Sequence, residues 1–288
     1  MDMRLKERYV GKKMAINKII PCSCIDGPGN RMVIFFQGCN FHCGYCHNPE
    51  TIHLCNHCGK CVNACPANAL STQDGKVIWK ENICIGCDVC IKTCRNLSSP
   101  KTKDYTVEEL MKIIIKSKDF LDGITVSGGE CTLNEAYLVE LFRQVKEKTK
   151  LTCFVDTNGG MDLSKMEELI SLTDGFMLDV KTVEEEEHIS LTGVSGENIK
   201  KNLKLLLERQ KLYEVRTVLA LGLHHENTVR YVAETIKDKC LYKLLKYRAF
   251  GVRKEGITQF GTEITKKEYM EGLVSLAKNQ GATKTVGI

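Results

Sequence analysis

A run of four closely spaced cysteines occurs twice between residues 51 and 100, and this repeat constrains the chain more than any other feature. Each run has the spacing Cys-x2-Cys-x2-Cys-x3-Cys. The two runs are Cys55, Cys58, Cys61 and Cys65, then Cys84, Cys87, Cys90 and Cys94. Cysteines at such short intervals favour metal ligation. The stretch also lacks a long amphipathic pattern, so we expect residues 51–100 to form an insert that interrupts a larger domain.

The repeat matches the pattern of bacterial ferredoxins, in which the last cysteine of each run ligates the cluster of the other run. Thiolates on a tight loop can reach three corners of one [4Fe–4S] cube, and the fourth corner takes a cysteine from the opposite half. Pro66 follows Cys65 as that pattern requires, whereas Arg95 stands where a second proline would be. The predicted ligand sets are Cys55, Cys58, Cys61 and Cys94 for one cluster, and Cys84, Cys87, Cys90 and Cys65 for the other.

Zinc ribbons are the alternative interpretation of the insert, and His53 and His57 lie close enough in the sequence to join such sites. Zinc motifs usually separate two short cysteine pairs, however, rather than placing four cysteines in one run. The spacing therefore favours a ferredoxin-like insert with two iron–sulfur clusters.

Sixteen cysteines in a chain of 288 residues also bear on where the protein works. Residues 1–18 are charged and lack the apolar region of a signal peptide. No apolar run approaches the ~20 residues that span a membrane. We therefore expect a cytoplasmic protein without membrane contact, in which thiols ligate metals rather than form disulfides.

The net charge of +5 gives no support to a nucleic-acid partner. It counts every thiol as neutral, and clusters bound by thiolates would offset it. The sequence also has no basic stripe with interleaved aromatic residues. We expect no nucleic-acid binding.

Outside the insert, apolar runs alternate with amphipathic stretches. The predicted strands are Met32–Gln37, Gly123–Val126, Leu151–Val155, Gly175–Leu178, Tyr213–Leu221 and Lys243–Phe250. The predicted helices are Thr106–Phe120, Glu135–Lys148, Ser164–Leu172, Gly196–Gln210, Asn227–Lys237 and Lys266–Asn279. This alternation indicates an α/β fold with a parallel sheet and right-handed crossovers. Six units favour a partial (β/α)6 TIM-like barrel over a doubly wound sheet, although periodicity alone does not separate the two.

The domain plan that follows is a core of residues 1–50 and 101–288, with residues 51–100 inserted. Within the core, Thr106 followed by Glu109 forms a capping box at a helix start. The acidic run Glu184–Glu187 is expected to begin a further helix, where the helix dipole favours negative charge.

A second cysteine motif, Cys39-x3-Cys43-x2-Cys46, follows the first predicted strand. Three thiolates on a four-iron cluster leave one iron without a protein ligand, and an open metal position can bind substrate. The surrounding letters QGCNFHCGYCHNPE resemble the signature of radical S-adenosylmethionine (SAM) enzymes. In that family, SAM binds the open iron through its amino and carboxylate groups. Three buried structural cysteines are the alternative.

Polar groups follow three further predicted strands, at the end where barrel enzymes place their chemistry. The strands end in Ser127–Glu130, Asp156–Gly159 and Asp179–Lys181. Each set could by itself be a plain turn or a local ion pair. Together they suit SAM, because carboxylates suit its ammonium and ribose hydroxyl groups and a lysine suits its carboxylate.

Taken together, the motifs resemble the glycyl-radical-enzyme activating enzymes of the radical SAM superfamily. Their order and spacing look closest to the YjjW-type activases. The resemblance runs from about residue 18 to residue 250. It rests on IDGPGNR at 25–31, CHNPE at 46–50, the ferredoxin-like insert, VSGGE, DTNG and LDVK.

The resemblance implies a reaction. A reduced [4Fe–4S] cluster would pass one electron to SAM, and the S–C5′ bond would break to give a 5′-deoxyadenosyl radical. That radical would take a hydrogen atom from a glycine of a partner glycyl radical enzyme. The electron would come from a reduced flavodoxin or ferredoxin. Segment 26–31 would lie near the incoming glycine, on the rim at the carboxyl ends of the strands.

The resemblance also implies roles for particular residues. The catalytic cluster would be held by Cys39, Cys43 and Cys46. The methionyl amino group of SAM would be bound by Gly128, Gly129 and Glu130. The rest of the SAM site would be lined by Asp156, Asn158, Asp179 and Lys181. With the insert, the implied cofactors are three [4Fe–4S] clusters and SAM.

Two departures from the family pattern concern the SAM site. Many activases carry His-x-x-Gly after the sixth strand, whereas residues 248–253 read RAFGVR, so Arg253 is a candidate substitute at the adenosine end. Cys131 stands where many relatives have proline, and we expect it to be a packed thiol. We also expect structural roles for Cys22, Cys24 and Cys153 and a solvated loop at His224 and His225.

A zinc-dependent nucleic-acid binder is disfavoured by the pattern of basic residues, and two other functions compete with the activase. One is a radical SAM enzyme that acts on a small molecule or peptide and has two auxiliary clusters. The other is an electron carrier fused to an α/β domain. Fully ligated insert clusters favour electron relay over substrate binding, and the open three-cysteine set argues against a pure carrier.

Overall fold

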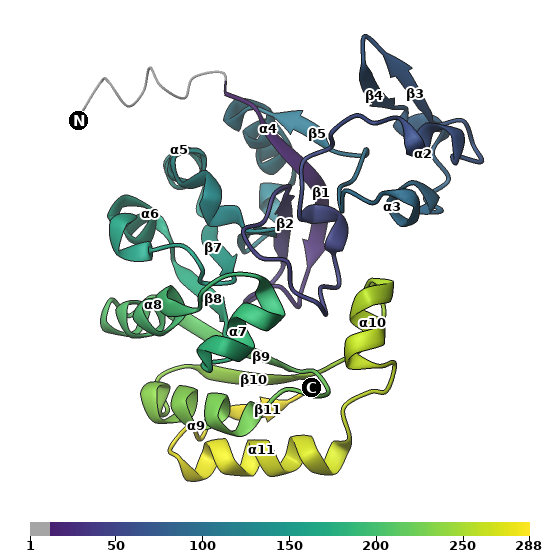
Figure 1. Ribbon diagram of the computed structural model, residues 1–288. Helices are drawn as coiled ribbons and strands as arrows, with labels where there is room; N and C mark the ends of the chain where they lie inside the picture. The colour runs from purple at the N-terminus through teal and green to yellow at the C-terminus, as the bar shows by residue number, and fades with distance from the viewer. Residues whose placement is uncertain (1–11) are drawn as a thin grey trace.

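The protein is described by a computed structural model of residues 12–288. Residues 1–11, which include much of the stretch in which we predict no signal peptide, lie outside the described residues. Most strands form a nine-stranded sheet in the order β11-β10-β9-β8-β7-β6-β2-β1-β5 (Figure 1). Its strands are β1 Met14–Ser23, β2 Arg31–Phe36, β5 Lys103–Tyr105, β6 Gly123–Gly128, β7 Thr152–Thr157, β8 Gly175–Asp179, β9 Leu212–Leu219, β10 Leu241–Lys246 and β11 Thr285–Gly287.

The sheet has the winding of a barrel. From β2 through β6 to β11, seven strands are parallel and lie in chain order. A doubly wound sheet would reverse its order at a switch point. The six predicted strands are all present, and β11 adds a seventh. The sheet ends at β5 and β11, which gives the open, partial barrel that the sequence predicts.

Helices follow most of the parallel strands. They are α4 Val107–Ser117, α5 Glu135–Lys148, α6 Glu167–Leu172, α7 Glu185–Thr192, α8 Glu197–Glu208, α9 His225–Ile236, α10 Lys254–Phe260 and α11 Lys267–Asn279. Figure 1 shows α4, α5, α6, α8, α9 and α11 along the outer side of the curved sheet. The capping box at Thr106 and Glu109 is present at the start of α4. The sequence pattern did not predict α10, and β10 ends four residues before its predicted end.

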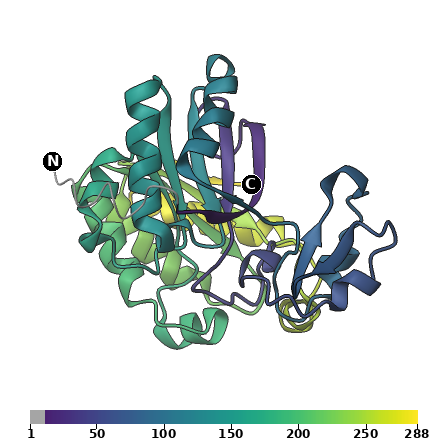
Figure 2. The ribbon, with the colours of Figure 1, turned by 90° about the horizontal axis from the view of Figure 1, so that it is seen from above.

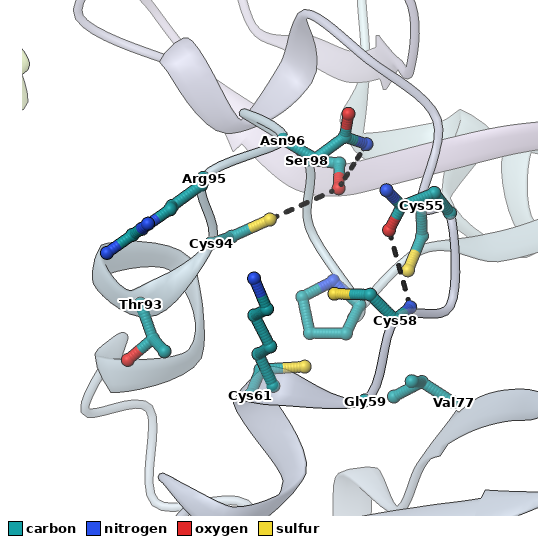
Figure 3. Close-up of a pocket in the computed structure, with 13 residues that line it drawn as sticks. Cys55, Cys58, Gly59, Cys61, Val77, Thr93, Cys94, Arg95, Asn96 and Ser98 are labelled. Atoms are coloured by element: carbon teal, nitrogen blue, oxygen red, sulfur yellow. Dashed lines mark hydrogen bonds between the residues drawn. The ribbon is translucent and has the colours of Figure 1, made fainter.

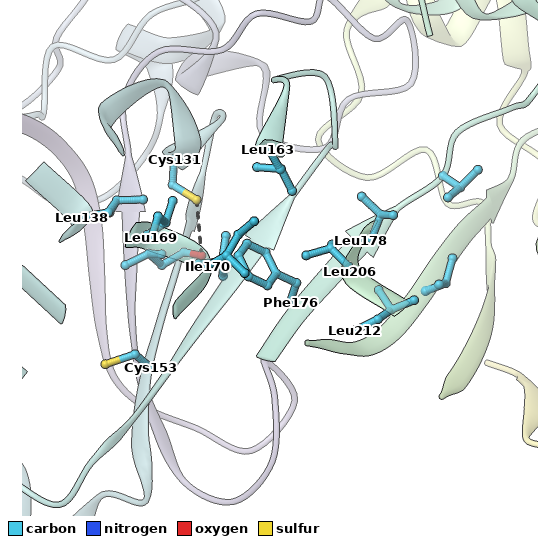
Figure 4. Close-up of a cluster of buried hydrophobic side chains, with 14 of the residues drawn as sticks. Cys131, Leu138, Cys153, Leu163, Leu169, Ile170, Phe176, Leu178, Leu206 and Leu212 are labelled. Atoms are coloured by element: carbon cyan, nitrogen blue, oxygen red, sulfur yellow. Dashed lines mark hydrogen bonds between the residues drawn. The ribbon is translucent and has the colours of Figure 1, made fainter. Parts of the chain in front are cut away.

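The main core lies between the sheet and these helices. Successive side chains of a strand point to opposite faces, so every second residue packs outward. Figure 4 shows Phe176 and Leu178 of β8 among helix residues such as Leu169 and Leu206. The alternate residues face the inside of the barrel, which is where polar groups collect.

The sequence pattern missed β1, whose half-exposed residues lack a clean alternation. β1 runs antiparallel to β2, with Ser23 opposite Arg31. The segment that joins them therefore lies at the amino-terminal ends of the parallel strands. Our expectation that segment 26–31 forms a rim at the carboxyl ends is wrong, because the antiparallel strand reverses the direction of the chain.

Residues 51–100 break the strand–helix rhythm, as expected from the sequence. They contain the short helices α2 Lys60–Asn63 and α3 Val89–Thr93 and the antiparallel strands β3 Leu70–Gln73 and β4 Lys76–Trp79. Figures 1 and 2 show this segment projecting to one side of the sheet. A small apolar cluster of its own is formed by Cys61, Leu70, Val77 and Cys90.

Arg31 ties segment 26–31 to the floor of the barrel. Its side chain is fully buried and donates hydrogen bonds to Thr125 Oγ1 at 2.8 Å, to Thr152 Oγ1 at 3.0 Å and to the Pro28 carbonyl at 3.0 Å. The guanidinium also lies over the Phe154 ring at 4.3 Å. Burial lowers the pKa of Arg31 to about 10, so the group stays charged at neutral pH. A buried cation therefore joins segment 26–31 to β6 and β7.

We expect Arg31→Met to lower the free energy of unfolding by about 3 kcal/mol, because it leaves several buried acceptors without a donor. The measurement is urea unfolding of the metal-free full chain. Arg209→Met is the control, since Arg209 makes a half-exposed ion pair with Glu167 and should contribute less than about 1 kcal/mol. Similar small losses in both variants would contradict an anchoring role for Arg31.

Candidate active site

The loop that carries Cys39, Cys43 and Cys46 follows β2 and is held by backbone hydrogen bonds on two sides. On one side, the Cys39 N–H donates to the Ile52 carbonyl at 2.9 Å. On the other side, the last turn of α7 accepts from the loop: the His42 N–H donates to the Thr192 carbonyl at 2.8 Å and the Gly44 N–H to the Leu191 carbonyl at 3.0 Å. Helix C-termini have carbonyls free for such bonds.

The three thiols are largely shielded from water. Burial raises the pKa of Cys39 to about 12 and that of Cys43 to about 11, although the nearby Lys181 ammonium opposes the shift at Cys43. Burial also raises the pKa of Cys46. Such thiols lose their protons when a metal group binds, because only the thiolate is a ligand.

Gly128 and Gly129 let the end of β6 lie against this loop. Gly128 has a φ of +118°, and a Cβ there would overlap backbone atoms of Phe36. A Cβ at Gly129 would overlap the Gly38 carbonyl. The Gly129 N–H donates to the Phe36 carbonyl at 2.9 Å. Both glycines are therefore required by the close approach of two backbone segments.

Glu130 is fully buried, and its carboxylate accepts four hydrogen bonds from protein groups. The donors are the N–H and hydroxyl of Thr132, the hydroxyl of Thr157 and the N–H of Asn158. Burial raises the pKa of Glu130, and these bonds oppose the rise. The carboxylate thus joins the end of β6 to the end of β7.

Asn158 extends this connection to the cysteine loop. Its side-chain amide donates to Asn40 Oδ1 at 2.9 Å and lies 3.7 Å from Cys39 Sγ. The predicted residues Glu130 and Asn158 therefore lie directly beside the three-cysteine motif.

The predicted residues Asp156, Asp179 and Lys181 meet at the same end of the barrel. Lys181 Nζ lies 2.6 Å from Asp179 Oδ2, and Ser127 Oγ donates to Asp156 Oδ2 at 2.9 Å. Burial opposes the charge on Lys181, but the carboxylate of Asp179 raises its pKa well above the usual value. The site therefore keeps a cation next to carboxylates at neutral pH.

The sequence analysis missed Arg216 on β9, which completes this group. Arg216 Nη1 lies 3.2 Å from Asp156 Oδ1, and its Nε binds Glu214. Glu214 in turn lies 2.7 Å from Lys243 Nζ. The signal in the sequence is the pair of charged residues at alternate positions of an otherwise apolar strand.

The insert brings together the two crossed cysteine sets. A hollow of about 270 Å³ has Cys55, Cys58, Cys61 and Cys94 in its lining. Figure 3 shows these four side chains around it. A narrower hollow has in its lining Cys65, Cys84, Cys87 and Cys90. Among residues 12–288, no three Cys, His, Asp or Glu side chains are arranged to hold a single metal ion.

The region after β10 also packs on the cysteine loop. Arg253 donates to the carbonyls of His42 and Cys43, both at 3.3 Å. Gly251 has a φ of +79°, and a Cβ there would overlap the His47 carbonyl. Arg253 therefore contacts the backbone of the cysteine loop. Gly251 is required because the segment after β10 lies against the His47 carbonyl.

The remaining thiols lie mostly in the core. Cys131 and Cys153 are fully buried, and the expectation of packed thiols at both positions is confirmed. Figure 4 labels both among the residues of the main core. Cys22 and Cys24 are exposed, and Cys22 Sγ donates to Asn30 Oδ1 at 2.8 Å. His224 is exposed as expected, whereas His225 is buried and its ring nitrogen lies 3.1 Å from the Tyr269 hydroxyl.

The sequence is similar to a known protein family and to individual enzymes. The sequence profile of the Radical SAM superfamily matches residues 33–238. The chain is 30% identical over 241 residues to the trans-4-hydroxy-L-proline dehydratase activating enzyme of Clostridioides difficile, covering 78% of each chain. It is 30% identical over 270 residues to the choline trimethylamine-lyase activating enzyme of Oleidesulfovibrio alaskensis, covering 85% of this chain and 87% of the relative.

The fold is also similar to that of solved structures. Streptococcus suis SuiB bound to its precursor peptide SuiA superposes with a TM-score of 0.55 at 13% identity, over 89% of this chain and 48% of SuiB. Within residues 12–288, no helix has both the length and the apolar character needed to cross a bilayer. The cytoplasmic location stays a prediction.

We expect Gly129→Ala to displace the start of the cysteine loop, because the added methyl group meets the Gly38 carbonyl. Overpacking of this kind should lower the free energy of unfolding by about 2 kcal/mol. Gly272→Ala in α11 is the control, since a Cβ there meets no atom within 4 Å and alanine favours a helix by up to ~1 kcal/mol. Urea unfolding of both variants tests this, and equal stability of Gly129→Ala and the parent chain would contradict the packing account.

Proposed function

The chain belongs to the radical SAM superfamily and, within it, to the glycyl-radical-enzyme activating enzymes, and we propose that it installs a glycyl radical on one partner enzyme. A [4Fe–4S] cluster with SAM, when bound, supplies one-electron chemistry strong enough to remove a hydrogen atom from a glycine Cα. The proposal is carried by one observation. The three-cysteine loop and the polar ends of β6 and β7 are joined by hydrogen bonds at one end of the barrel.

In this proposal, Cys39, Cys43 and Cys46 would hold the cluster, and three protein ligands would leave it able to bind SAM. Lys181 binds the SAM carboxylate as a charge-assisted donor. Asp156 and Asp179 accept hydrogen bonds from the ammonium and ribose hydroxyl groups. The chain's own contribution is to hold these groups at fixed positions and to keep water out of the barrel.

The Ser-Gly-Gly-Glu segment takes part in a different way. The carboxylate of Glu130 already accepts four hydrogen bonds from protein groups. In this proposal it therefore stabilises the site without contacting SAM. We propose that Gly128 and Gly129 offer backbone carbonyls to the methionyl amino group, while Asn158 orients the cysteine loop. Carbonyl groups are suitable acceptors for an ammonium.

We further propose that residues 51–100 are a ferredoxin-like insert with two [4Fe–4S] clusters that relay electrons. The insert contacts the catalytic loop, because His53 Nε2 lies 2.9 Å from His42 Nε2. An acidic carrier, a reduced flavodoxin or ferredoxin, would be the donor. Among the described residues of the insert, Lys76, Lys80 and Lys92 are exposed and make no ion pair, so they could steer such a partner.

Two cysteine variants test the division of labour. Cys43→Ala should abolish SAM cleavage, because it removes a ligand of the catalytic cluster. Cys87→Ala should keep SAM binding but slow the delivery of electrons from reduced flavodoxin. The measurements are 5′-deoxyadenosine formation and the glycyl radical signal on the partner by electron paramagnetic resonance. If Cys87→Ala, given a strong chemical reductant, no longer bound SAM, the insert would not be a separate relay.

Iron and sulfide analysis tests the number of clusters. Eleven of the sixteen cysteines are assigned as ligands, and three [4Fe–4S] clusters correspond to about twelve irons per chain. The measurement uses anaerobically reconstituted full chain. A reproducible value near four or near eight irons would remove two or one of the insert clusters.

A further inference from the structure

The inside of the barrel carries a row of charges that the proposed SAM contacts do not explain. Glu214 lies on β9 with only 1% of its side chain exposed. Its carboxylate lies between Arg216 on the same strand and Lys243 on β10, with Lys243 Nζ 2.7 Å from Oε2. The Lys243 contact is an ion pair without hydrogen-bond geometry, since Oε2 accepts no hydrogen bond. The charged form of so buried a carboxylate is stable only when neighbouring cations offset its loss of hydration.

The guanidinium of Arg216 is divided between two carboxylates. Its Nε binds Glu214, its Nη1 reaches Asp156 at 3.2 Å, and its Nη2 lies 3.0 Å from Met177 Sδ. Arginine usually binds one carboxylate through two parallel N–H bonds. Here the Arg216 Nε–H donates to Glu214, so Asp156 accepts from Nη1 alone.

We infer that Glu214 is a positioning residue for SAM binding, which acts by holding Arg216 to a single contact with Asp156. This inference rests on the proposed SAM site. With Arg216 held at Nε, the oxygens of Asp156 keep capacity to accept hydrogen bonds from SAM. Without Glu214, the guanidinium is free to turn and bind Asp156 through two N–H groups.

The carboxylates of Asp156, Asp179 and Glu214 face the cations Lys181, Arg216 and Lys243 inside the barrel. The proposed effect of Glu214 passes through the orientation of Arg216, and it does not require Glu214 to touch SAM.

The experiment is a double-mutant cycle on the cluster-loaded full chain, with SAM affinity measured by calorimetry. Glu214→Gln should weaken SAM binding about tenfold, equivalent to about 1.4 kcal/mol. In an Asp156→Asn background, Glu214→Gln should add little further loss, because Arg216 no longer has a carboxylate to bind through two bonds. Glu168→Gln is the matched control, since Glu168 pairs with Arg143 on the surface and should not change the affinity.

A second measurement needs no cluster. In nitrogen-15 spectra of the metal-free full chain, the Arg216 Nε–H resonance should move in Glu214→Gln and stay unchanged in Glu168→Gln. If Glu214→Gln did not change the SAM affinity, or if its loss added fully to that of Asp156→Asn, the role of Glu214 would be overturned. The proposed function would not be affected. A loaded parent chain that does not bind SAM would overturn both the proposed function and the role of Glu214.

Discussion

The arrangement of the site depends on one buried carboxylate, that of Glu130. A carboxylate without water is stable only when protein donors replace its hydration. Two of the residues that donate to it, Thr157 and Asn158, lie at the end of the neighbouring strand β7, so satisfying the charge also fixes two strand ends against each other. The Asn158 side chain also donates a hydrogen bond to the cysteine loop. The need to stabilise the Glu130 carboxylate therefore fixes β6, β7 and the cysteine loop relative to one another.

The cysteine loop is fixed from several directions by contacts within the protein. Ile52 holds its start, the last turn of α7 holds its middle, and Arg253 binds two of its carbonyls. On the side of the loop these contacts are made by backbone groups, so they constrain the path of the chain more than the identity of the loop's side chains. A loop held in this way loses less conformational entropy when its thiols bind a metal group.

Much of this could be predicted from the sequence, because the relevant signals are local. Period and spacing gave the six parallel strands, their helices and the crossed cysteine sets that line two hollows. The antiparallel β1 has no alternation of apolar and polar residues, so the sequence did not predict it. Without β1, segment 26–31 was predicted at the wrong end of the barrel. Arg216 and Glu214 lie two residues apart, but their partners Asp156 and Lys243 come from other strands, and only the sheet register joins them. The closer resemblance to YjjW-type activases stays a prediction.

The insert leaves and rejoins the core at almost one point. The His53 N–H donates to the Leu97 carbonyl at 3.0 Å, so the two ends of the intervening segment are already bonded to each other. The ion pair between Lys103 of β5 and Glu81 of the segment is about half exposed, and such pairs contribute little to stability. We therefore expect the insert to be a detachable module in an evolutionary sense: a lineage could acquire, exchange or lose it by one event in the gene, while the catalytic barrel kept its own geometry.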